Sequence, residues 1–156
     1  MSQEIGYTDT RKMIAPSRIA EVMGGSQVLG RRFGSVYALS EAISQGLPKG
    51  ALRQTAGRVF EGKSEQRELM NRIVPEATFK RRRERLSAAE SERTERVARV
   101  MATAEYVWGD RTDARRFVTT PHPALRGRTP LDAAMTELGA RYVEEILDKI
   151  FYGLPA

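Results

Sequence analysis

The chain has 156 residues, 40% of them hydrophobic, and carries 26 Lys and Arg against 20 Asp and Glu, for a net charge of +6. This apolar content can offset chain entropy and excludes intrinsic disorder, and the length is that of one domain or of two small ones sharing a core. The absence of cysteine excludes disulfide scaffolds, thiol nucleophiles and Cys-ligated zinc.

The N-terminal segment shows no helical or strand periodicity. Its first ten residues, MSQEIGYTDT, lack the apolar core of a signal peptide, and no apolar run in the chain approaches the roughly 20 residues that cross a bilayer. We therefore expect a soluble, cytoplasmic protein with no membrane partner, in which residues 1–34 form a partly flexible leader.

Hydrophobic residues recur at three- and four-residue spacing from Ser35 onward, whereas alternation is absent. This pattern predicts helices almost throughout and no strand. Gly46 is predicted to end the first of these helices, Pro48 to begin the second and Gly62 to end it. The predicted fold class is all-α.

Residues 64–86 have the form of a helix-turn-helix, with a helix capped by Ser64, a turn at Val74 and Pro75, and a short second helix. Phe79 and Leu86 are expected to face inward from this second helix. The positions i, i+3, i+4 and i+7 predict a shared outer face composed of Thr78, Arg81, Arg82 and Arg85. One hydroxyl and three guanidiniums suit the DNA major groove, with Lys80 beside them as a phosphate contact. The alternative is a solvated basic helix end.

The positive charge is concentrated in the middle of the chain. Residues 51–100 have a net charge of +5, compared with +2 for residues 1–50 and −1 for residues 101–156. Arginine supplies 21 of the 26 cations, and its forked donors suit phosphates and base edges. This distribution indicates two roles in one chain, although a solvated charged surface is the alternative.

Further helices are predicted in the C-terminal half. Ser87 and Glu90 form a capping box for a long helix that ends near Gly109. Its buried stripe is predicted to contain Val97, Val100, Met101, Ala104 and Trp108. A short helix over 112–119 precedes the Pro- and Gly-rich run 121–130, and Thr129 is expected to cap the next helix. The last helix is predicted to begin near Gly139, with a core face of Val143, Ile146, Leu147 and Ile150.

A second, polar stripe runs along the last helix. It contains Tyr142, Glu145, Lys149 and Tyr152, and a Gly-Leu-Pro-Ala tail follows it. Tyrosine combines contact area with a hydrogen-bonding tip, so this stripe suits a partner protein, the alternative being that both tyrosines pack at the rim of the core. His122 is expected on a surface loop. Arg126 and Arg128 flank a glycine in an exposed turn, where they hold an anion, a backbone carbonyl or nothing.

The residues predict no catalytic centre. There is a single histidine, no nucleophile beside a base, no Gly-rich phosphate loop and no carboxylate or histidine cluster with metal spacing. We therefore expect no catalytic residue, no metal and no cofactor. An enzyme on an all-α scaffold is the weakest of the functional hypotheses.

From residue 46 to residue 153 the chain resembles the antitoxins of the MbcA/ParS/Xre group, which partner toxins of the RES class. The matching segments, in order and at the expected spacing, are Gly-Leu-Pro at 46–48, Thr-Phe-Lys-Arg-Arg at 78–82, Leu-Ser-Ala-Ala-Glu-Ser-Glu-Arg at 86–93, Arg-Val-Ala-Arg-Val at 96–100, Val-Trp-Gly-Asp at 107–110, Pro-His-Pro-Ala-Leu-Arg-Gly-Arg-Thr-Pro-Leu-Asp at 121–132 and Tyr-Gly at 152–153, with Ala104, Gly139, Val143 and Ile150.

The resemblance implies an Xre-like helix-turn-helix domain over 35–90 and a helical toxin-binding domain over 91–156. The first would bind operator DNA through Thr78, Lys80, Arg81, Arg82 and Arg85. The second would place its C-terminal segment at the NAD-binding cleft of a RES toxin, which degrades NAD or transfers ADP-ribose. The expected toxin contacts are Arg126, Arg128, Tyr142, Glu145, Lys149, Tyr152, Gly153, Leu154, Pro155 and Ala156.

A repressor that binds a palindrome is expected to be a homodimer. The resemblance therefore implies a homodimer within a larger toxin–antitoxin complex. The alternative function is a DNA-binding regulator with a dimerising C-terminal domain and no toxin partner.

Overall fold

A computed structural model describes residues 14–156, and every regular element in this range is a helix, which confirms the all-α fold class. In chain order the elements are α2 (Pro16–Val22), α3 (Gly25–Leu29), α4 (Val36–Gln45), α5 (Lys49–Val59), α6 (Lys63–Ile73), α7 (Glu76–Arg81), α8 (Ala88–Trp108), α9 (Arg111–Thr119), the 3-10 turn η1 (Pro123–Leu125), α10 (Pro130–Ala133) and α11 (Glu137–Phe151).

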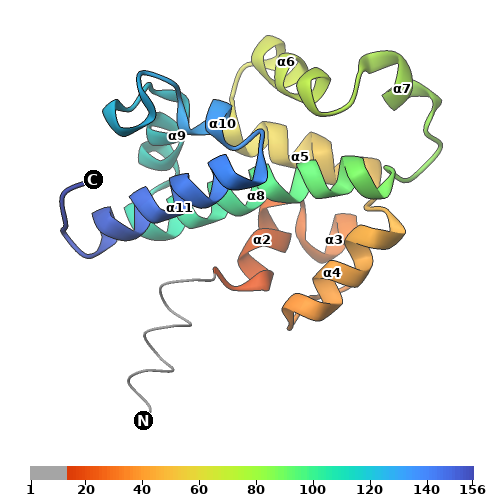
Figure 1. The fold of residues 1–156 in the computed structure, drawn as a ribbon. Helices are drawn as coiled ribbons and strands as arrows, with labels where there is room; N and C mark the ends of the chain where they lie inside the picture. The colour runs from red at the N-terminus through yellow and green to blue at the C-terminus, as the bar shows by residue number, and fades with distance from the viewer. Residues whose placement is uncertain (1–13) are drawn as a thin grey trace.

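The long helix α8 forms the centre of the fold (Figure 1). Helices α2, α4, α5, α9 and α11 all pack against it. The inward stripe predicted from the 3.6-residue period is confirmed for Val97, Val100, Met101 and Ala104, each at most 2% exposed. Because α8 spans residues 88–108, the domain boundary that we predicted between residues 90 and 91 falls inside this helix, and its position stays a prediction.

The N-terminal segment contains two helices that the sequence pattern did not predict. Of the leader expected over 1–34, residues 1–13 lie outside the described residues, whereas the segment from 16 to 29 forms α2 and α3. These helices are short and Gly24 and Gly30 separate them from their neighbours, so neither contains enough turns to show a clear period. The segment nevertheless contributes to the core with Ile19, Ala20, Val22 and Met23.

The capping box predicted at the start of α8 is confirmed. Ser87 Oγ accepts a hydrogen bond from the Glu90 amide at 3.1 Å, and Glu90 Oε1 accepts one from the Ser87 amide at 2.8 Å. The cap predicted for α6 is wrong. The N-cap there is Gly62 in an extended conformation, and Ser64 lies inside the first turn because the helix already begins at Lys63.

A tight corner joins α10 to α11. Thr136 caps α11 by accepting from the Gly139 amide at 3.0 Å, so the helix begins two residues before the predicted start. A Cβ at Gly139 would overlap the carbonyl oxygen of Ala133, so this close approach requires glycine. The core face of α11 follows the prediction, with three buried residues and one half-buried residue: Val143, Ile146, Leu147 and Ile150.

Candidate functional site

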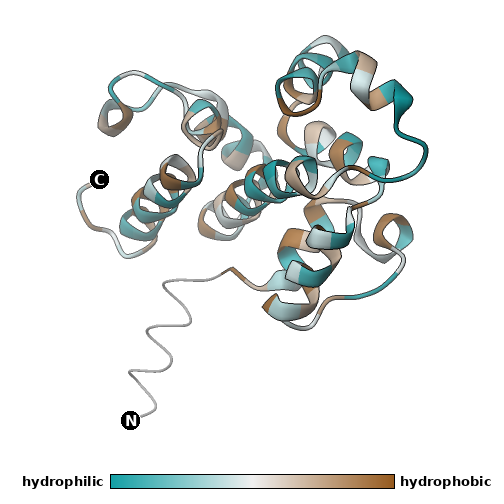
Figure 2. Cartoon of the chain, turned by 45° about the vertical axis from the view of Figure 1, so that its right-hand side comes forward, coloured by the Kyte–Doolittle hydropathy of each residue, from teal (hydrophilic) through white to brown (hydrophobic). Residues whose placement is uncertain are grey.

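The helix-turn-helix predicted over 64–86 corresponds to α6, a turn at Val74 and Pro75, and α7. Pro75 takes the N-cap position of α7, and Leu69 and Ile73 fix α6 in the core. The ring of Phe79 is half-buried and packs against the core, as expected. Both helices lie at an outer corner of the molecule, far from the C-terminus in both views (Figures 1 and 2).

The predicted arginine face of the second helix is wrong beyond Arg81. Helix α7 ends at that residue, and Arg82 is its C-cap with extended backbone angles (φ −65°, ψ 134°). Arg85 lies in the loop that follows. Thr78 and Arg81 therefore share a helix, whereas Arg82 and Arg85 do not continue its face.

The loop after α7 is extended because it pairs with the chain that follows α4. The Leu86 amide donates to the Leu47 carbonyl at 2.8 Å, and the Lys49 amide donates to the Glu84 carbonyl at 2.9 Å. Gly46 ends α4 as predicted, at φ 100°, and a side chain there would overlap the carbonyl oxygen of Leu86. The pairing brings Leu86 into the core, while residues 82–85 form a hydrophilic loop outside any helix (Figure 2).

Arg82 and Arg85 hold this loop against the rest of the protein. Arg82 donates from Nε and Nη2 to the two carboxylate oxygens of Glu90 at 3.1 and 3.0 Å, and Arg85 donates from Nη1 to the Gly46 carbonyl at 2.9 Å. Burial raises the pKa of Glu90, but the hydrogen bonds from Arg82 and Ser87 outweigh burial and leave that pKa below its ordinary value. Both guanidiniums therefore have a structural use, and their contact with DNA stays a prediction.

The other three predicted DNA contacts lie on α7. Lys80 forms an exposed ion pair with Glu76 at 3.3 Å, and Arg81 Nη2 donates to Thr78 Oγ1 at 3.4 Å. With the loop residues 82–85, Thr78 and Arg81 line a hollow of about 330 Å³. The charge of this hollow suits an anionic ligand, because four of its six lining residues are arginines.

The polar stripe predicted on α11 lies on the solvent side of the helix. Tyr142 and Tyr152 are 45% and 44% exposed, and Glu145 and Lys149 are also exposed. The two tyrosines are therefore not buried in the core.

The tail leaves α11 through a well-defined C-cap. Gly153 has φ +70°, its amide donates to the Ile150 carbonyl at 3.1 Å, and the Leu154 amide donates to the Lys149 carbonyl at 2.8 Å. These two bonds form a Schellman motif, in which glycine supplies the left-handed residue that ends the helix. The Tyr-Gly pair at 152–153 thus has a structural role, and residues 152–156 are all exposed.

Additional aromatic side chains that the sequence analysis missed adjoin the end of this stripe. Tyr106 on α8 stacks on Phe151 with 5.6 Å between ring centroids, and Phe151 contacts Tyr152 edge-to-face at 5.0 Å. The guanidinium of Arg18 lies 5.0 Å from the Tyr106 ring centroid. The first two rings are 45 positions apart in sequence, so no local pattern links them, and they meet because α8 and α11 lie side by side.

The prediction that Trp108 belongs to the core is wrong. This side chain is 41% exposed, since it stands at the last residue of α8, where the helix runs beyond the core. Its ring lies 6.1 Å from that of Phe117. A partly exposed tryptophan provides apolar surface to a partner protein.

The Pro- and Gly-rich loop over 121–129 contains one short 3-10 turn and is closed by hydrogen bonds within it and to α10. His122 Nδ1 accepts from the Ala124 amide at 3.1 Å, and Arg128 Nη2 donates to the Asp132 carbonyl at 3.1 Å. Arg126 is exposed and adopts φ 57°, which is uncommon for a residue with a side chain. We expected Arg126 and Arg128 to hold an anion, a backbone carbonyl or nothing. Arg128 holds a backbone carbonyl.

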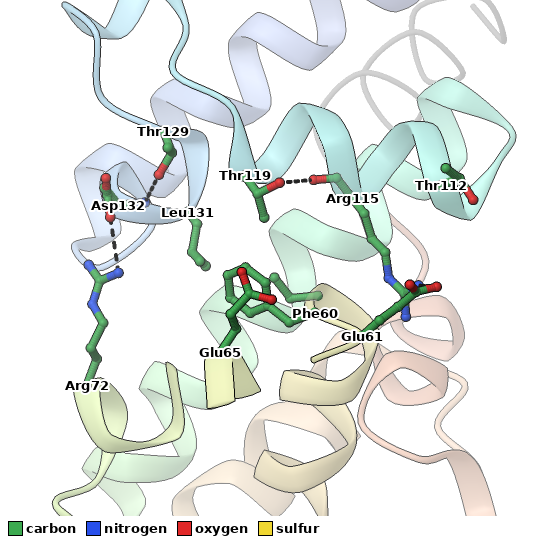
Figure 3. A pocket seen from close by; sticks show the side chains of 11 residues that line it. Phe60, Glu61, Glu65, Arg72, Thr112, Arg115, Thr119, Thr129, Leu131 and Asp132 are labelled. Atoms are coloured by element: carbon green, nitrogen blue, oxygen red, sulfur yellow. Dashed lines mark hydrogen bonds and ion pairs between the residues drawn. The ribbon is translucent and has the colours of Figure 1, made fainter. Parts of the chain in front are cut away.

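A hollow of about 510 Å³ separates the two halves (Figure 3). Residues from α6 and the end of α5 line one side, and residues from α9 and α10 line the other. Arg72 pairs with Asp132 at 3.0 Å, and Arg115 pairs with Glu61 at 2.9 Å while donating to two carbonyl groups of α5. The guanidiniums of Arg72 and Arg115 both bind partners on the other side of the hollow. The hollow is therefore a junction that joins the two halves.

Among residues 14–156 no group of three or more His, Asp or Glu side chains is placed to hold a metal ion. None of the described helices has the length and apolar character needed to cross a bilayer.

Comparison with known proteins assigns both halves. Residues 38–99 match the antitoxin Xre-like helix-turn-helix domain, and residues 103–153 match the antitoxin Xre/MbcA/ParS C-terminal toxin-binding domain. An antitoxin Xre of Pseudomonas putida strain KT2440 is 37% identical over 86 residues, which are 53% of this chain and 54% of that protein. The chain thus spans about half the length of this curated relative. These matches confirm the predicted combination of a helix-turn-helix half and a C-terminal toxin-binding half, and neither matched domain belongs to an enzyme family.

Proposed function

Because this chain belongs to the Xre/MbcA/ParS family of antitoxins, we propose that it neutralises a toxin encoded beside it and represses their shared operon. The toxin is of the RES class and consumes NAD, by degrading it or by transferring ADP-ribose. The antitoxin places its C-terminal segment at the NAD-binding cleft, so that the toxin no longer binds its substrate.

The observation that carries this proposal is the exposed tyrosine stripe of α11, which continues into an exposed tail. Tyr142 and Tyr152 present rigid apolar rings with polar tips, which is the composition that protein interfaces favour. The stripe lies within the segment matched to a toxin-binding domain. Phe151 and Tyr106 enlarge the apolar area next to it, and Leu154 extends it along the tail.

Charged side chains at the edge of this surface select the partner. Glu145 and Lys149 lie between the two tyrosines, and Arg126 is exposed on the loop before α10 and suits toxin carboxylates. Arg128 contributes in the same way while it holds the Asp132 carbonyl. The antitoxin supplies binding energy and steric exclusion, and the chemistry belongs to the toxin.

The helix-turn-helix half binds operator DNA through α7. Thr78, Lys80 and Arg81 contact phosphates and base edges, whereas Arg82 and Arg85 act mainly by holding the loop that follows. A homodimer would place two such helices on the two halves of a palindromic operator.

The toxin-binding proposal is tested by truncation. Deleting residues 152–156 retains Phe151 and its stack on Tyr106, so the fold should be kept while the segment that reaches the toxin cleft is lost. We expect the truncated protein to bind the product of the neighbouring gene at least tenfold more weakly and to protect neither cell growth nor cellular NAD. The matched control is Tyr37→Ala, which removes an exposed ring on α4 and should protect like the wild type.

Three outcomes separate the possibilities. Full protection by the truncated protein would show that the tail does not occupy the cleft. A neighbouring product that is toxic without lowering NAD would contradict the RES assignment. If no neighbouring product is toxic or co-purifies with the chain, the antitoxin role fails and a DNA-binding regulator remains.

A further inference from the structure

A second basic hollow, of about 460 Å³, lies between α5, α6 and α7. This second hollow is distinct from the one lined by Arg81 and residues 82–85. Lys80 of α7 lines the second hollow. Glu76 is the single carboxylate among its lining residues. The cations around it come from all three helices: Lys49, Arg53, Lys63, Arg67 and Lys80.

Two of these cations share one aromatic ring. Lys49 Nζ lies 4.3 Å from the centroid of the Phe79 ring, and the Arg53 guanidinium carbon lies 5.1 Å from it. Lys49 Nζ also donates to the Arg82 carbonyl at 3.0 Å. The cation–π contacts hold both charges at the edge of the hollow without neutralising them.

Lys63 and Arg67 are exposed, and neither forms an ion pair or hydrogen bond with another described residue. Elsewhere in the fold guanidiniums such as those of Arg99 and Arg115 are engaged by carboxylates and carbonyls. Lys63 also stands at the first position of α6, where the helix dipole disfavours positive charge. Neither Lys63 nor Arg67 therefore forms a polar interaction that stabilises the fold. Their positions indicate that they bind an anion.

We propose that this hollow binds the phosphate backbone of double-stranded DNA and extends the operator contact from α7 onto α5 and α6. The inference rests on the proposed repressor function and names contacts that sequence reasoning did not reach. In a helix-turn-helix the first helix crosses the DNA backbone while the second enters the major groove. Here α6 precedes the turn and carries Lys63 and Arg67, and α5 adds Arg53 beside them.

An anionic polymer fits this arrangement better than an acidic protein patch. All three helices lie within the segment matched to the helix-turn-helix domain. Their cations continue those of α7, since Lys80 lines this hollow while Arg81 lines the other. Regularly spaced phosphates can occupy both hollows along one strand, and each neutralised phosphate releases counterions.

The test measures binding of the full-length protein to a duplex of the sequence upstream of its own gene, as a function of salt. The variant R53A/K63A/R67A removes three cations of the hollow. We expect its affinity to fall roughly 10- to 100-fold near physiological salt and the log–log salt slope to flatten by about 2 to 3. The matched control R111A/R116A/R141A removes three exposed cations from the C-terminal half and should change affinity less than threefold.

The outcomes distinguish this inference from the function on which it rests. If the wild-type protein does not bind the duplex, the repressor proposal fails. If it binds and the two triple variants behave alike, the repressor proposal stands and this hollow is not a DNA contact. Loss of toxin binding by R53A/K63A/R67A with DNA binding unchanged would also overturn the inference, in favour of a protein partner. Should the triple variant unfold, K63Q/R67Q alters only side chains without partners among the described residues, and an unchanged salt slope for it would contradict the proposal.

Discussion

Two glycines determine how α11 begins and ends, and thus where the proposed partner surface lies. Gly153 adopts the left-handed conformation that stops the helix and releases the exposed tail. Gly139 has an ordinary backbone, and its role is to leave space: a Cβ there would overlap the Ala133 carbonyl oxygen and lie 2.9 Å from Thr136 Oγ1. The backbone atom cannot move aside as the end of a flexible side chain would.

We therefore expect Gly139→Ala to lower the free energy of unfolding by about 3 kcal/mol, measured by urea denaturation. Gly34→Ala is the matched control, because Gly34 has no positive φ and a Cβ there meets no atom within 4 Å. It should leave the free energy of unfolding within about 0.5 kcal/mol of the wild type. Equal stability of the two variants would show that the α10–α11 corner relaxes freely.

At the scale of elements, α8 and α11 are joined by ion pairs as well as by their apolar stripes. Arg96 and Arg99 of α8 both pair with Glu137 of α11, and Arg99 forms the larger network. Arg99 of α8 pairs with Glu144 of α11 at 2.7 Å, with Glu137 at 3.1 Å and with Glu95 at 3.0 Å. Burial raises the pKa of Glu95 and of Glu144, and the attraction of Arg99 offsets only part of this effect. Burial also lowers the pKa of Arg99, but the three carboxylates outweigh burial and leave it raised.

Arg99→Leu should cost about 3 kcal/mol of unfolding free energy at pH 7, because two buried carboxylates lose their main counter-charge. A carboxyl group whose pKa is higher in the folded than in the unfolded state lowers the free energy of unfolding as the pH rises through these pKa values. Loss of Arg99 raises the folded-state pKa of both carboxyl groups further. The deficit relative to the wild type should therefore shrink as pH falls from 7 towards the ordinary carboxyl pKa of 4.5. A deficit that is equal at pH 5 and pH 8 would contradict this account.

The control for this comparison is Arg116→Leu. Arg116 pairs with Asp113 at 2.9 Å, but the two side chains are 69% and 44% exposed, so the loss should be below about 0.5 kcal/mol and should not follow the titration of a buried carboxylate.

At the scale of the whole molecule, the corner formed by α6 and α7 and the C-terminal end of α11 lie toward opposite ends of α8, and the two halves are tied together across the hollow of Figure 3. Arg115 donates to the carbonyls of Gly57 and Arg58 at 2.9 Å and is mostly buried. The Arg72–Asp132 pair also crosses the hollow, but both of its side chains are about 40% exposed to water (39% and 41%). The first tie should therefore be the stronger one.

Arg115→Ala should lower the free energy of unfolding by about 2–3 kcal/mol, since it leaves two carbonyl groups without their partner. Arg72→Ala should cost less than about 1 kcal/mol, as exposed ion pairs do. Thermal and urea denaturation of both variants measure the difference. A larger loss for Arg72→Ala would mean that the exposed pair is the main link between the halves.

Much of the fold could be predicted because its determinants are local. Ser87 and Glu90 are three residues apart and form the expected capping box, and the stripes of α8 and α11 follow from the helical period. The tyrosine stripe of α11 was found in the same way, since a helix places such residues on one face whatever it packs against. The family was also identified from an ordered set of short motifs, each of which is contiguous in sequence.

The predicted arginine face of the second helix was wrong because its determinants are not local. Whether α7 continued to Arg85 depended on backbone pairing between Leu86 and Leu47, which lie 39 positions apart, and on Glu90 as the partner of Arg82. Spacing along the chain contains no information about such contacts.

The chain's periodicity and caps were therefore sufficient for most of its helices from residue 36 onward, for its two halves and for its polar C-terminal stripe, because a helix depends on interactions within a few residues. Packing was needed to show which cations bind partners within the protein, as Arg82 does. It was also needed to show which cations have no partner among the described residues and can bind a ligand, as Lys63 and Arg67 can. Packing also brought Tyr106 to Phe151. These outcomes depend on distances between helices, and those distances are established only when the core of α8 and its neighbours assembles.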